Sequence, residues 1–153
     1  IEHVGVSSTT IRQSLLAGNV SVANEYLGRK YAITGLVTKG EQLGRKIGYP
    51  TANVYVPEDY KLIPGDGVYA VQVQIAGETH DGMLNIGNRP TVSGRNKTIE
   101  VNLFNFDEDI YGLTVTVLFV DFLRRERKFD DLEHLKKQLD QDKQQVQTML
   151  KND

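Results

Sequence analysis

The chain has 153 residues and a formal net charge of −2 at pH 7, and it contains no cysteine. These values exclude disulfides, thiolate metal sites and cysteine nucleophiles, and they argue against a binder of duplex nucleic acid, which needs a basic face for the phosphates. With 39% apolar and 25% charged residues, no secretory signal and no apolar stretch long enough to cross a bilayer, the composition is typical of a cytoplasmic globular domain.

Two short helices are predicted at the start of the chain. The hydroxyl side chains of residues 7–9 can cap a first helix, in which Ile11, Leu15 and Leu16 follow at helical spacing and which ends at Gly18. A second helix is predicted over residues 20–27, where apolar residues recur at helical spacing and a glycine follows. The pattern then changes from helical to extended.

From residue 30 to about residue 124 the sequence has the alternation and the β-branched content of strands. Four segments show it, namely residues 31–37, 71–75, 99–103 and 114–120. Turn signals lie between them, at residues 64–67, 76–78, 87–90 and 111–112. Short strands separated by turns, with no helical pattern between them, favour an antiparallel barrel or sandwich.

The C-terminal segment is predicted to be a helix. Its apolar residues fall on one helical face, at positions 132, 135, 139, 146, 149 and 150. Residues 129–131 precede it and supply an N-cap and an acidic first turn. The residues alone therefore predict a small β-barrel flanked by helices.

The segment of residues 40–53 carries the strongest local signal for chemistry. It contains three glycines at four-residue spacing with two cations among them, namely Gly40, Gly44, Arg45, Lys46 and Gly48. Glycines let backbone N–H groups approach a ligand closely, and the cations add charge for a polyphosphate. The segment is neither a Walker A loop nor a dinucleotide fingerprint, and its glycines alone would favour a simple hairpin connection.

The residues that follow these glycines shift the interpretation toward a metal–phosphate site. Pro50 is rigid, and Thr51 and Asn53 stand two residues apart, so in an extended segment their side chains point to the same side. A hydroxyl and a carboxamide offer neutral oxygen ligands of the kind that Mg²⁺ accepts when phosphates supply the rest.

The run of residues 44–53 resembles the signature of the riboflavin kinase family, Gly-Arg-x-x-Gly-aromatic-Pro-Thr-Ala-Asn. Three further segments match that family in order, namely residues 82–91, 99–104 and 123–129. The resemblance implies a mainly β fold, a six-stranded antiparallel Greek-key barrel with short N-terminal helices and a long C-terminal helix. The implied reaction is transfer of the γ-phosphoryl group of ATP to the ribityl 5′-hydroxyl of riboflavin, with Mg²⁺, to give FMN and ADP.

The resemblance also implies roles for single residues. Glu100 matches the catalytic base, and Thr51 and Asn53 match the magnesium site. The implied nucleotide-binding residues are Gly40, Gly44, Arg45, Gly48, Pro50, Thr51 and Asn53. The implied flavin-binding residues are Glu100, Asn102, Arg124, Glu126, Phe129 and Leu132.

Several of these residues also have plainer interpretations. Glu100 has the pattern of an ordinary solvent-facing strand residue, and Phe129 fits a hydrophobic staple at the helix entrance. Asn85 and residues 89–91 fit a structural turn, whereas residues 125, 127 and 128 fit a solvated turn.

Position 102 departs from the family pattern. The family often has His there, and this chain has Asn102. Alternation places Asn102 on the same strand face as Glu100, where its amide is able to hydrogen-bond to the carboxylate or to the flavin. This departure is interpreted as tuning of the reaction rather than loss of it.

The segment of residues 7–12 is similar to the closing motif of the adenylyltransferase module in bacterial bifunctional FAD synthetases. Together with a first residue that is not Met, this implies a helical remnant or linker over residues 1–27 and a kinase domain over residues 28–153. The implied partners are riboflavin, ATP and a covalently linked adenylyltransferase domain, with no nucleic acid and no membrane. The alternative is a non-catalytic β-barrel module that binds flavin or nucleotide.

Overall fold

The computed structural model describes residues 4–39, 43–57, 61–92 and 94–152. Its elements are α1 (Val4–Leu16), α2 (Val20–Leu27), β1 (Ala32–Thr38), the 3-10 helix η1 (Leu43–Ile47), β2 (Ala52–Tyr55), β3 (Gly67–Ile75), β4 (Glu78–Thr91), β5 (Gly94–Leu103), β6 (Thr114–Arg124) and α3 (Leu132–Lys151). Within these ranges, no helix combines the length and the apolar character needed to cross a membrane.

The six strands form a closed antiparallel barrel in the order β1-β2-β5-β4-β3-β6. Strands β3, β4 and β5 follow one another as neighbours, and β6 returns to pair with β3 and then closes the barrel on β1. This is Greek-key connectivity. The predicted fold class is confirmed, including the N-terminal helices and the long C-terminal helix.

Strand β4 corrects one part of the sequence interpretation. Residues 87–90 were predicted to form a turn, but β4 continues through them to Thr91 and pairs with β5 along that stretch. Pro90 stands opposite Arg95, close to the end of the hairpin, where the missing N–H of a proline disturbs the ladder least. Strands β2 and β4 are the two strands that the alternation pattern did not predict.

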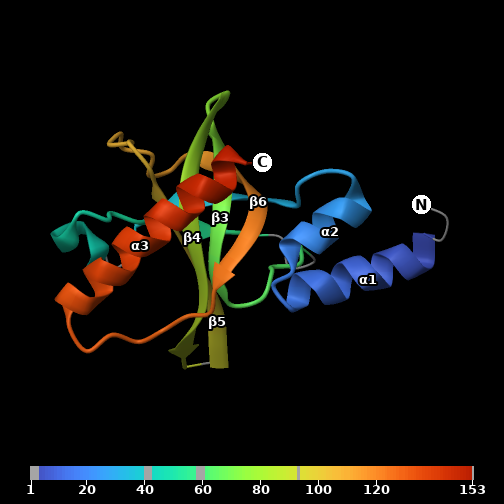
Figure 1. Cartoon of the computed structure of the whole chain (residues 1–153), viewed down its shortest axis with the longest axis horizontal. Coiled ribbons are helices and arrows are strands. Elements are labelled where there is room, and N and C mark those ends of the chain that lie inside the picture. Colours follow the sequence, from blue (N-terminus) through green and yellow to red (C-terminus); the bar gives the residue numbers. More distant parts are fainter. Residues whose placement is uncertain (1–3, 40–42, 58–60, 93, 153) are drawn as a thin grey trace.

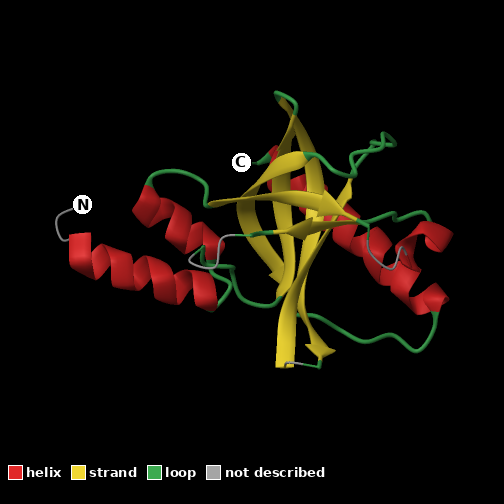
Figure 2. Ribbon diagram, turned by 180° about the vertical axis from the view of Figure 1, so that it is seen from behind, coloured by secondary structure: helices red, strands yellow, loops and turns green. Residues whose placement is uncertain are grey.

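Two apolar clusters hold the molecule together. The first fills the barrel interior and includes Leu15, Val20 and Ala23 of the N-terminal helices. The second lies between the barrel wall and α3, where Met83 and Val146 are among its buried members. In Figures 1 and 2, α1 and α2 lie to one side of the barrel while α3 crosses another side. Helix α3 therefore covers a wall of the barrel with its apolar stripe.

One predicted helix start is wrong, because α1 begins at Val4 and residues 7–9 lie inside it rather than at its N-cap. Two other predicted helix-end signals are confirmed. Gly28 ends α2 in the left-handed conformation with φ 73°, as glycine does most readily. Asp131 is the N-cap of α3, and its carboxylate accepts a hydrogen bond from the backbone N–H of His134 at 2.8 Å.

Candidate active site

Two cavities meet at Thr51, just before β2. The larger cavity, of about 440 Å³, lies between residues 50–52, η1 and the connection from β5 to β6. The smaller cavity, of about 220 Å³, lies between the barrel wall and α3, with residues 124–129 along one side. Among the described residues that line them, only Thr51 borders both. A group bound in one cavity can therefore meet a group bound in the other at this hydroxyl.

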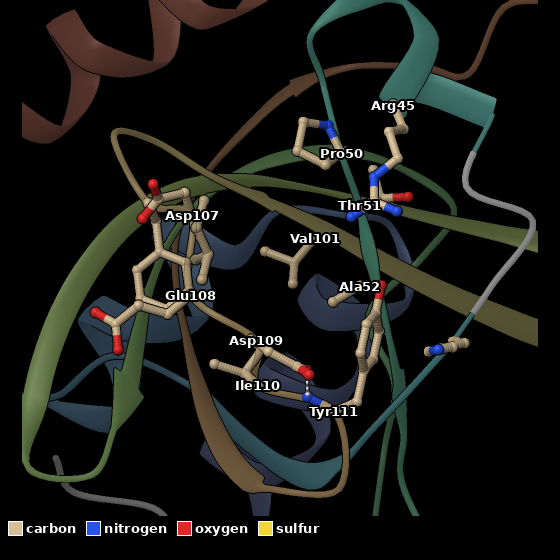
Figure 3. A pocket seen from close by; sticks show the side chains of 13 residues that line it. Arg45, Pro50, Thr51, Ala52, Val101, Asp107, Glu108, Asp109, Ile110 and Tyr111 are labelled. Carbon is tan, nitrogen blue, oxygen red and sulfur yellow. Dashed lines mark hydrogen bonds between the residues drawn. The ribbon is translucent and has the colours of Figure 1, made fainter.

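The larger cavity has charged sides and an apolar centre. Arg45 and Lys39 bring positive charge to it, and residues 107–109 form an acidic run. Figure 3 shows Val101 and Ala52 between Arg45 and this acidic run. Cations beside a small apolar surface suit a ligand that has both phosphates and a planar ring.

Tyr111 gives the larger cavity an aromatic wall. Its backbone N–H donates to Asp109 Oδ1 at 3.0 Å, a contact drawn in Figure 3. The ammonium group of Lys39 lies 5.2 Å from the centre of the Tyr111 ring, within range of a cation–π contact. The connection between β5 and β6 is thereby joined to the end of β1.

The smaller cavity combines an apolar slot with polar side chains. Its apolar lining consists of Tyr49, Val68, Met83, Leu84, Phe129, Leu135 and Leu139. Its polar lining consists of Thr51, Asn85, Glu100, Asn102, Arg124, Glu126 and Arg127. Such a lining fits a flat apolar ligand that carries a few polar groups.

Glu100 lies beside Thr51 at the junction of the cavities. The Thr51 hydroxyl donates to Glu100 Oε1 at 3.3 Å. In the sheet, Glu100 stands opposite Asn53 on β2 and opposite Asn85 on β4. Directly opposite residues of an antiparallel pair point to the same face, so these side chains share one face of the barrel wall. The pairing brings together residues from three separate strands.

Asn53 supplies an observation that bears on metal binding. Its side-chain oxygen Oδ1 is buried and has no hydrogen-bond partner in the structure. Buried polar atoms are normally satisfied, so this buried oxygen has the character of a cation ligand. In the described ranges there is no group of three or more His, Cys, Asp or Glu residues that could hold a metal alone. Thr51 and Asn53 therefore fit Mg²⁺ held jointly with ligand phosphates, since Mg²⁺ takes few protein ligands in such sites.

Two of the three glycines predicted to bind phosphate lie in η1 or directly after it, beside the larger cavity that Arg45 of η1 lines. Gly40 falls outside the described residues. Gly44 lies in η1, and Gly48 follows η1 with φ 86° and donates its N–H to the Arg45 carbonyl at 3.3 Å. Gly48 lines neither cavity, whereas Arg45 and Pro50 line the larger one.

Three of the predicted flavin residues line the smaller cavity with partners of their own. Glu126 accepts a hydrogen bond from the Asn85 amide at 3.0 Å, and Arg124 forms an ion pair with Asp142 of α3. The Phe129 ring lies beneath the Arg127 guanidinium, 5.2 Å from its centre.

Two of the predicted flavin residues have other surroundings than expected. Leu132 lines neither cavity and is 37% exposed, whereas Leu135 and Leu139, further along the same helix, line the smaller one, so the flavin contact of Leu132 stays a prediction. The Asn102 amide does not bind the Glu100 carboxylate but donates to the Pro50 carbonyl at 2.7 Å. Asn102 therefore holds the backbone that leads into Thr51.

Sequence reasoning missed several residues that the fold brings to the smaller cavity. Asn85 was predicted to lie in a turn but sits within β4, and Arg127 was predicted to be solvated but lies over Phe129 and lines the cavity. Tyr49 was not singled out, although it is an aromatic residue next to Pro50. All three lie in segments that match the family, but the sequence alone did not show that they line this cavity.

Tyr49 has the most perturbed environment of the described residues at the site. Burial raises the pKa of its hydroxyl well above the ordinary value, and the hydrogen bond that it donates to Asp140 Oδ1 at 2.5 Å raises the pKa further. The same hydrogen bond lowers the pKa of the Asp140 carboxyl. At neutral pH the pair is thus a neutral phenol bound to a carboxylate.

Comparisons with known proteins agree on one family. The family model described as riboflavin kinase (flavokinase) matches residues 27–150. The bifunctional riboflavin kinase/FMN adenylyltransferase of Bacillus subtilis is 41% identical over 144 residues, covering 92% of this chain and 45% of that protein. The protein of the same name from Escherichia coli K12 is 43% identical over 140 residues, covering 91% of this chain and 44% of that protein. The chain spans less than half the length of these relatives.

Two solved structures are similar to this chain in both fold and sequence. The crystal structure of the macrolide-efflux protein from Streptococcus pneumoniae has a TM-score of 0.89 and 40% identity, covering 96% of this chain and 49% of that chain. The structure of riboflavin kinase from Trypanosoma brucei has a TM-score of 0.55 and 25% identity, covering 78% of this chain and 79% of that chain. Since the family model spans most of the sequence, the chain belongs to the riboflavin kinase (flavokinase) family.

Proposed function

We propose that this chain transfers the γ-phosphoryl group of ATP to the ribityl 5′-hydroxyl of riboflavin, giving FMN and ADP. The observation that carries the proposal is the position of Thr51, which borders both cavities and lies 3.3 Å from the Glu100 carboxylate. The smaller cavity suits the isoalloxazine ring, and the larger cavity suits the nucleotide. The hydroxyl and the γ-phosphate then meet beside Glu100.

The nucleotide side of the reaction depends on charge neutralisation and positioning, which phosphoryl transfer needs most. Arg45 and Lys39 supply positive charge in the larger cavity. Thr51 and Asn53 would hold Mg²⁺, which when bound offsets the charge of the phosphates. The Asn102 amide fixes the Pro50 carbonyl and so holds the backbone on which Thr51 stands.

Glu100 is proposed as the general base. As the riboflavin 5′-oxygen forms its bond to the γ-phosphorus, its proton passes to the Glu100 carboxylate. The bond from the γ-phosphorus to the bridging oxygen breaks, and ADP leaves with that electron pair. A positioned carboxylate that accepts a proton in this way contributes about a hundredfold to ten-thousandfold in rate.

The test is direct formation of FMN. Incubation of the chain with riboflavin, ATP and MgCl₂, followed by chromatography, should give FMN well above a control without protein. Riboflavin binding without any FMN would instead support the alternative, a β-barrel module that binds flavin or nucleotide without catalysis.

The organisation of a longer parent protein remains part of the proposal. The family match begins at residue 27, beside the predicted boundary between residues 1–27 and residues 28–153. The names of the curated relatives include an FMN adenylyltransferase activity. We propose that in a longer parent this chain is joined to such an adenylyltransferase domain and works in the cytoplasm.

A further inference from the structure

Asp142 is an unusual residue for its position on α3. The apolar stripe of this helix packs on the barrel through Leu139, Val146 and Leu150, and Asp142 lies within that stripe with no exposed surface. Burying a carboxylate costs free energy unless it is paired and hydrogen-bonded. An apolar residue at position 142 would continue the stripe. The presence of a buried carboxylate there therefore needs an explanation, which its contacts supply.

Asp142 is paired with Arg124, at the end of β6. Arg124 Nε donates to Asp142 Oδ1 at 2.9 Å, and Nη2 donates to Oδ2 at 2.7 Å, so two guanidinium nitrogens bind the carboxylate. Arg124 Nη1 donates to the carbonyl of Arg125 at 2.9 Å. Such a two-point contact fixes the orientation of the guanidinium as well as its position. Arg124 lines the smaller cavity, and Asp142 does not.

Gln138 extends this network along the same wall. Its Nε2 donates to Asp142 Oδ1 at 2.9 Å, and its Oε1 accepts from Arg127 Nη1 at 2.7 Å. Arg127 in turn lies over the ring of Phe129. Helix α3 thereby holds Arg124 and Arg127 directly, and Phe129 through Arg127, along the side of the smaller cavity.

A second anchor on α3 holds another residue that lines the smaller cavity, Tyr49. Asp140 accepts the Tyr49 hydroxyl at 2.5 Å and is also paired with Lys136 at 3.3 Å. Tyr49 is buried and directly precedes Pro50 and Thr51. Asp140 lines neither cavity. Through Tyr49 it contacts the segment that carries the proposed phosphate and metal ligands.

We propose that α3 is a two-point brace in which Asp142 positions the flavin wall through Arg124, and Asp140 positions the Thr51 segment through Tyr49. Both aspartates are positioning residues, because they act on the cavity through other side chains. The brace rests on the proposed function, since it assigns riboflavin to the smaller cavity and the phosphates to the Thr51 side. It sets the distance between the two walls, and with it the alignment of the riboflavin hydroxyl beside Glu100.

The test compares one variant at each anchor. Asp142→Asn removes the charge that orients Arg124, and we expect the riboflavin Kd and KM to rise about tenfold, or 1.4 kcal/mol, with less than about a twofold change in the KM for Mg·ATP. Tyr49→Phe keeps the ring and removes the hydroxyl, and we expect kcat to fall about tenfold because the aligned geometry loosens. The riboflavin Kd of that variant should stay within about twofold of the wild-type value.

A matched control and a milder variant separate positioning from stability. Asp81→Asn makes the same chemical change at an exposed position on β4 that lines neither cavity, and its kinetic constants should match wild type. If Asp142→Asn fails to fold, Gln138→Ala serves in its place, because it breaks only the link from Arg127 to Asp142. The riboflavin Kd of Gln138→Ala should still rise about threefold.

The outcomes distinguish failure of the brace from failure of the proposed function. Riboflavin binding, followed by quenching of its fluorescence, needs no turnover. An active wild type with unchanged riboflavin affinity in Asp142→Asn or in Gln138→Ala would overturn the brace alone. The brace would also be overturned if Asp142→Asn and Tyr49→Phe each lost affinity for riboflavin and for Mg·ATP equally, in proportion to a lowered Tm. That pattern would indicate a purely structural role, which affects both walls together. A wild type that binds riboflavin but forms no FMN would overturn the proposed function.

Discussion

Thr51 is the residue at which the proposed reaction can be tested for its metal. Thr51→Ala removes one of the two oxygens assigned to Mg²⁺ and leaves the apolar lining of both cavities in place. Changes at the residues around a metal typically cost about ten- to a hundredfold in metal affinity or activity, so the Mg·ATP Kd should rise by that factor. Thr51→Ser keeps the hydroxyl and should bind Mg·ATP nearly as wild type does.

The measurement for this pair of variants is calorimetric titration with ATP in the presence and absence of Mg²⁺. The loss in Thr51→Ala should appear only with Mg²⁺ present. Unchanged affinity for Mg·ATP in that variant would count against the metal assignment.

The Tyr49–Asp140 pair predicts how stability changes at high pH. The folded-state pKa of Tyr49 lies above that of an unfolded tyrosine, which is about 10. As the pH rises above that value, the unfolded phenol loses its proton while the folded one keeps it. The free energy of unfolding should therefore fall with pH, by up to about 1.4 kcal/mol per pH unit from this group.

Urea unfolding between about pH 9 and pH 11, a range that brackets the ordinary tyrosine pKa, measures this slope. In Tyr49→Phe the decline should be less steep than in wild type. Equal slopes in the two proteins would contradict the assigned environment of Tyr49. The remaining decline in the variant is expected because burial also raises the pKa of Tyr69.

Helix α2 is predicted to stabilise the barrel rather than merely precede it. The Asn24 amide donates to the Phe119 carbonyl at 2.8 Å, and its Oδ1 accepts the N–H of Tyr31 at 2.7 Å. Asn24→Ala leaves both backbone groups without these partners, at a cost of about 1–3 kcal/mol each. Thermal unfolding should show a Tm lowered by about 2–4 °C for each kcal/mol.

Ser21→Ala is the control for this prediction, because Ser21 lies on the same helix and is exposed. Its Tm should stay close to that of wild type. Equal Tm values for Asn24→Ala and Ser21→Ala would show that α2 does not support the barrel through Asn24, even though Val20 and Ala23 join the interior cluster.

The elements differ in how far the sequence predicts them. Helix α2 matches its predicted residues because the apolar spacing and the left-handed cap at Gly28 are local signals. Strand β4 was missed because residues 87–90 resemble turn residues. Within β4, a Cβ at Gly82 would lie 2.6 Å from the Asn102 carbonyl, so this glycine permits close approach of β5.

At the scale of the whole molecule, closure of the barrel depends on pairings that no local pattern records. Alternation predicted four strands, and the count of six came from the family resemblance. Thr51, Glu100 and Asn85 all lie in segments that match the family, but Asn85 reaches the cavity only because β4 pairs with β5. Tyr49 and Asp140 are 91 residues apart in sequence and meet only in the fold.

The pairing of distant segments also explains how a chain of near-neutral net charge can bind a polyphosphate. The proposed phosphate site needs only local cations such as Arg45, the two metal-binding oxygens and Mg²⁺, and the net charge of −2 does not prevent it. Glu100 stands where this site meets the smaller cavity. The central claim of the account is that phosphoryl transfer takes place there.

A single-turnover measurement of FMN formation by Glu100→Gln, alongside a riboflavin titration, tests that claim most directly. The amide keeps the size of the side chain but cannot accept the hydroxyl proton. We predict that the variant binds riboflavin with a Kd within about threefold of the wild-type value. We predict that it forms FMN more slowly by about a hundredfold or more. FMN formation by the variant at close to the wild-type rate would contradict the account.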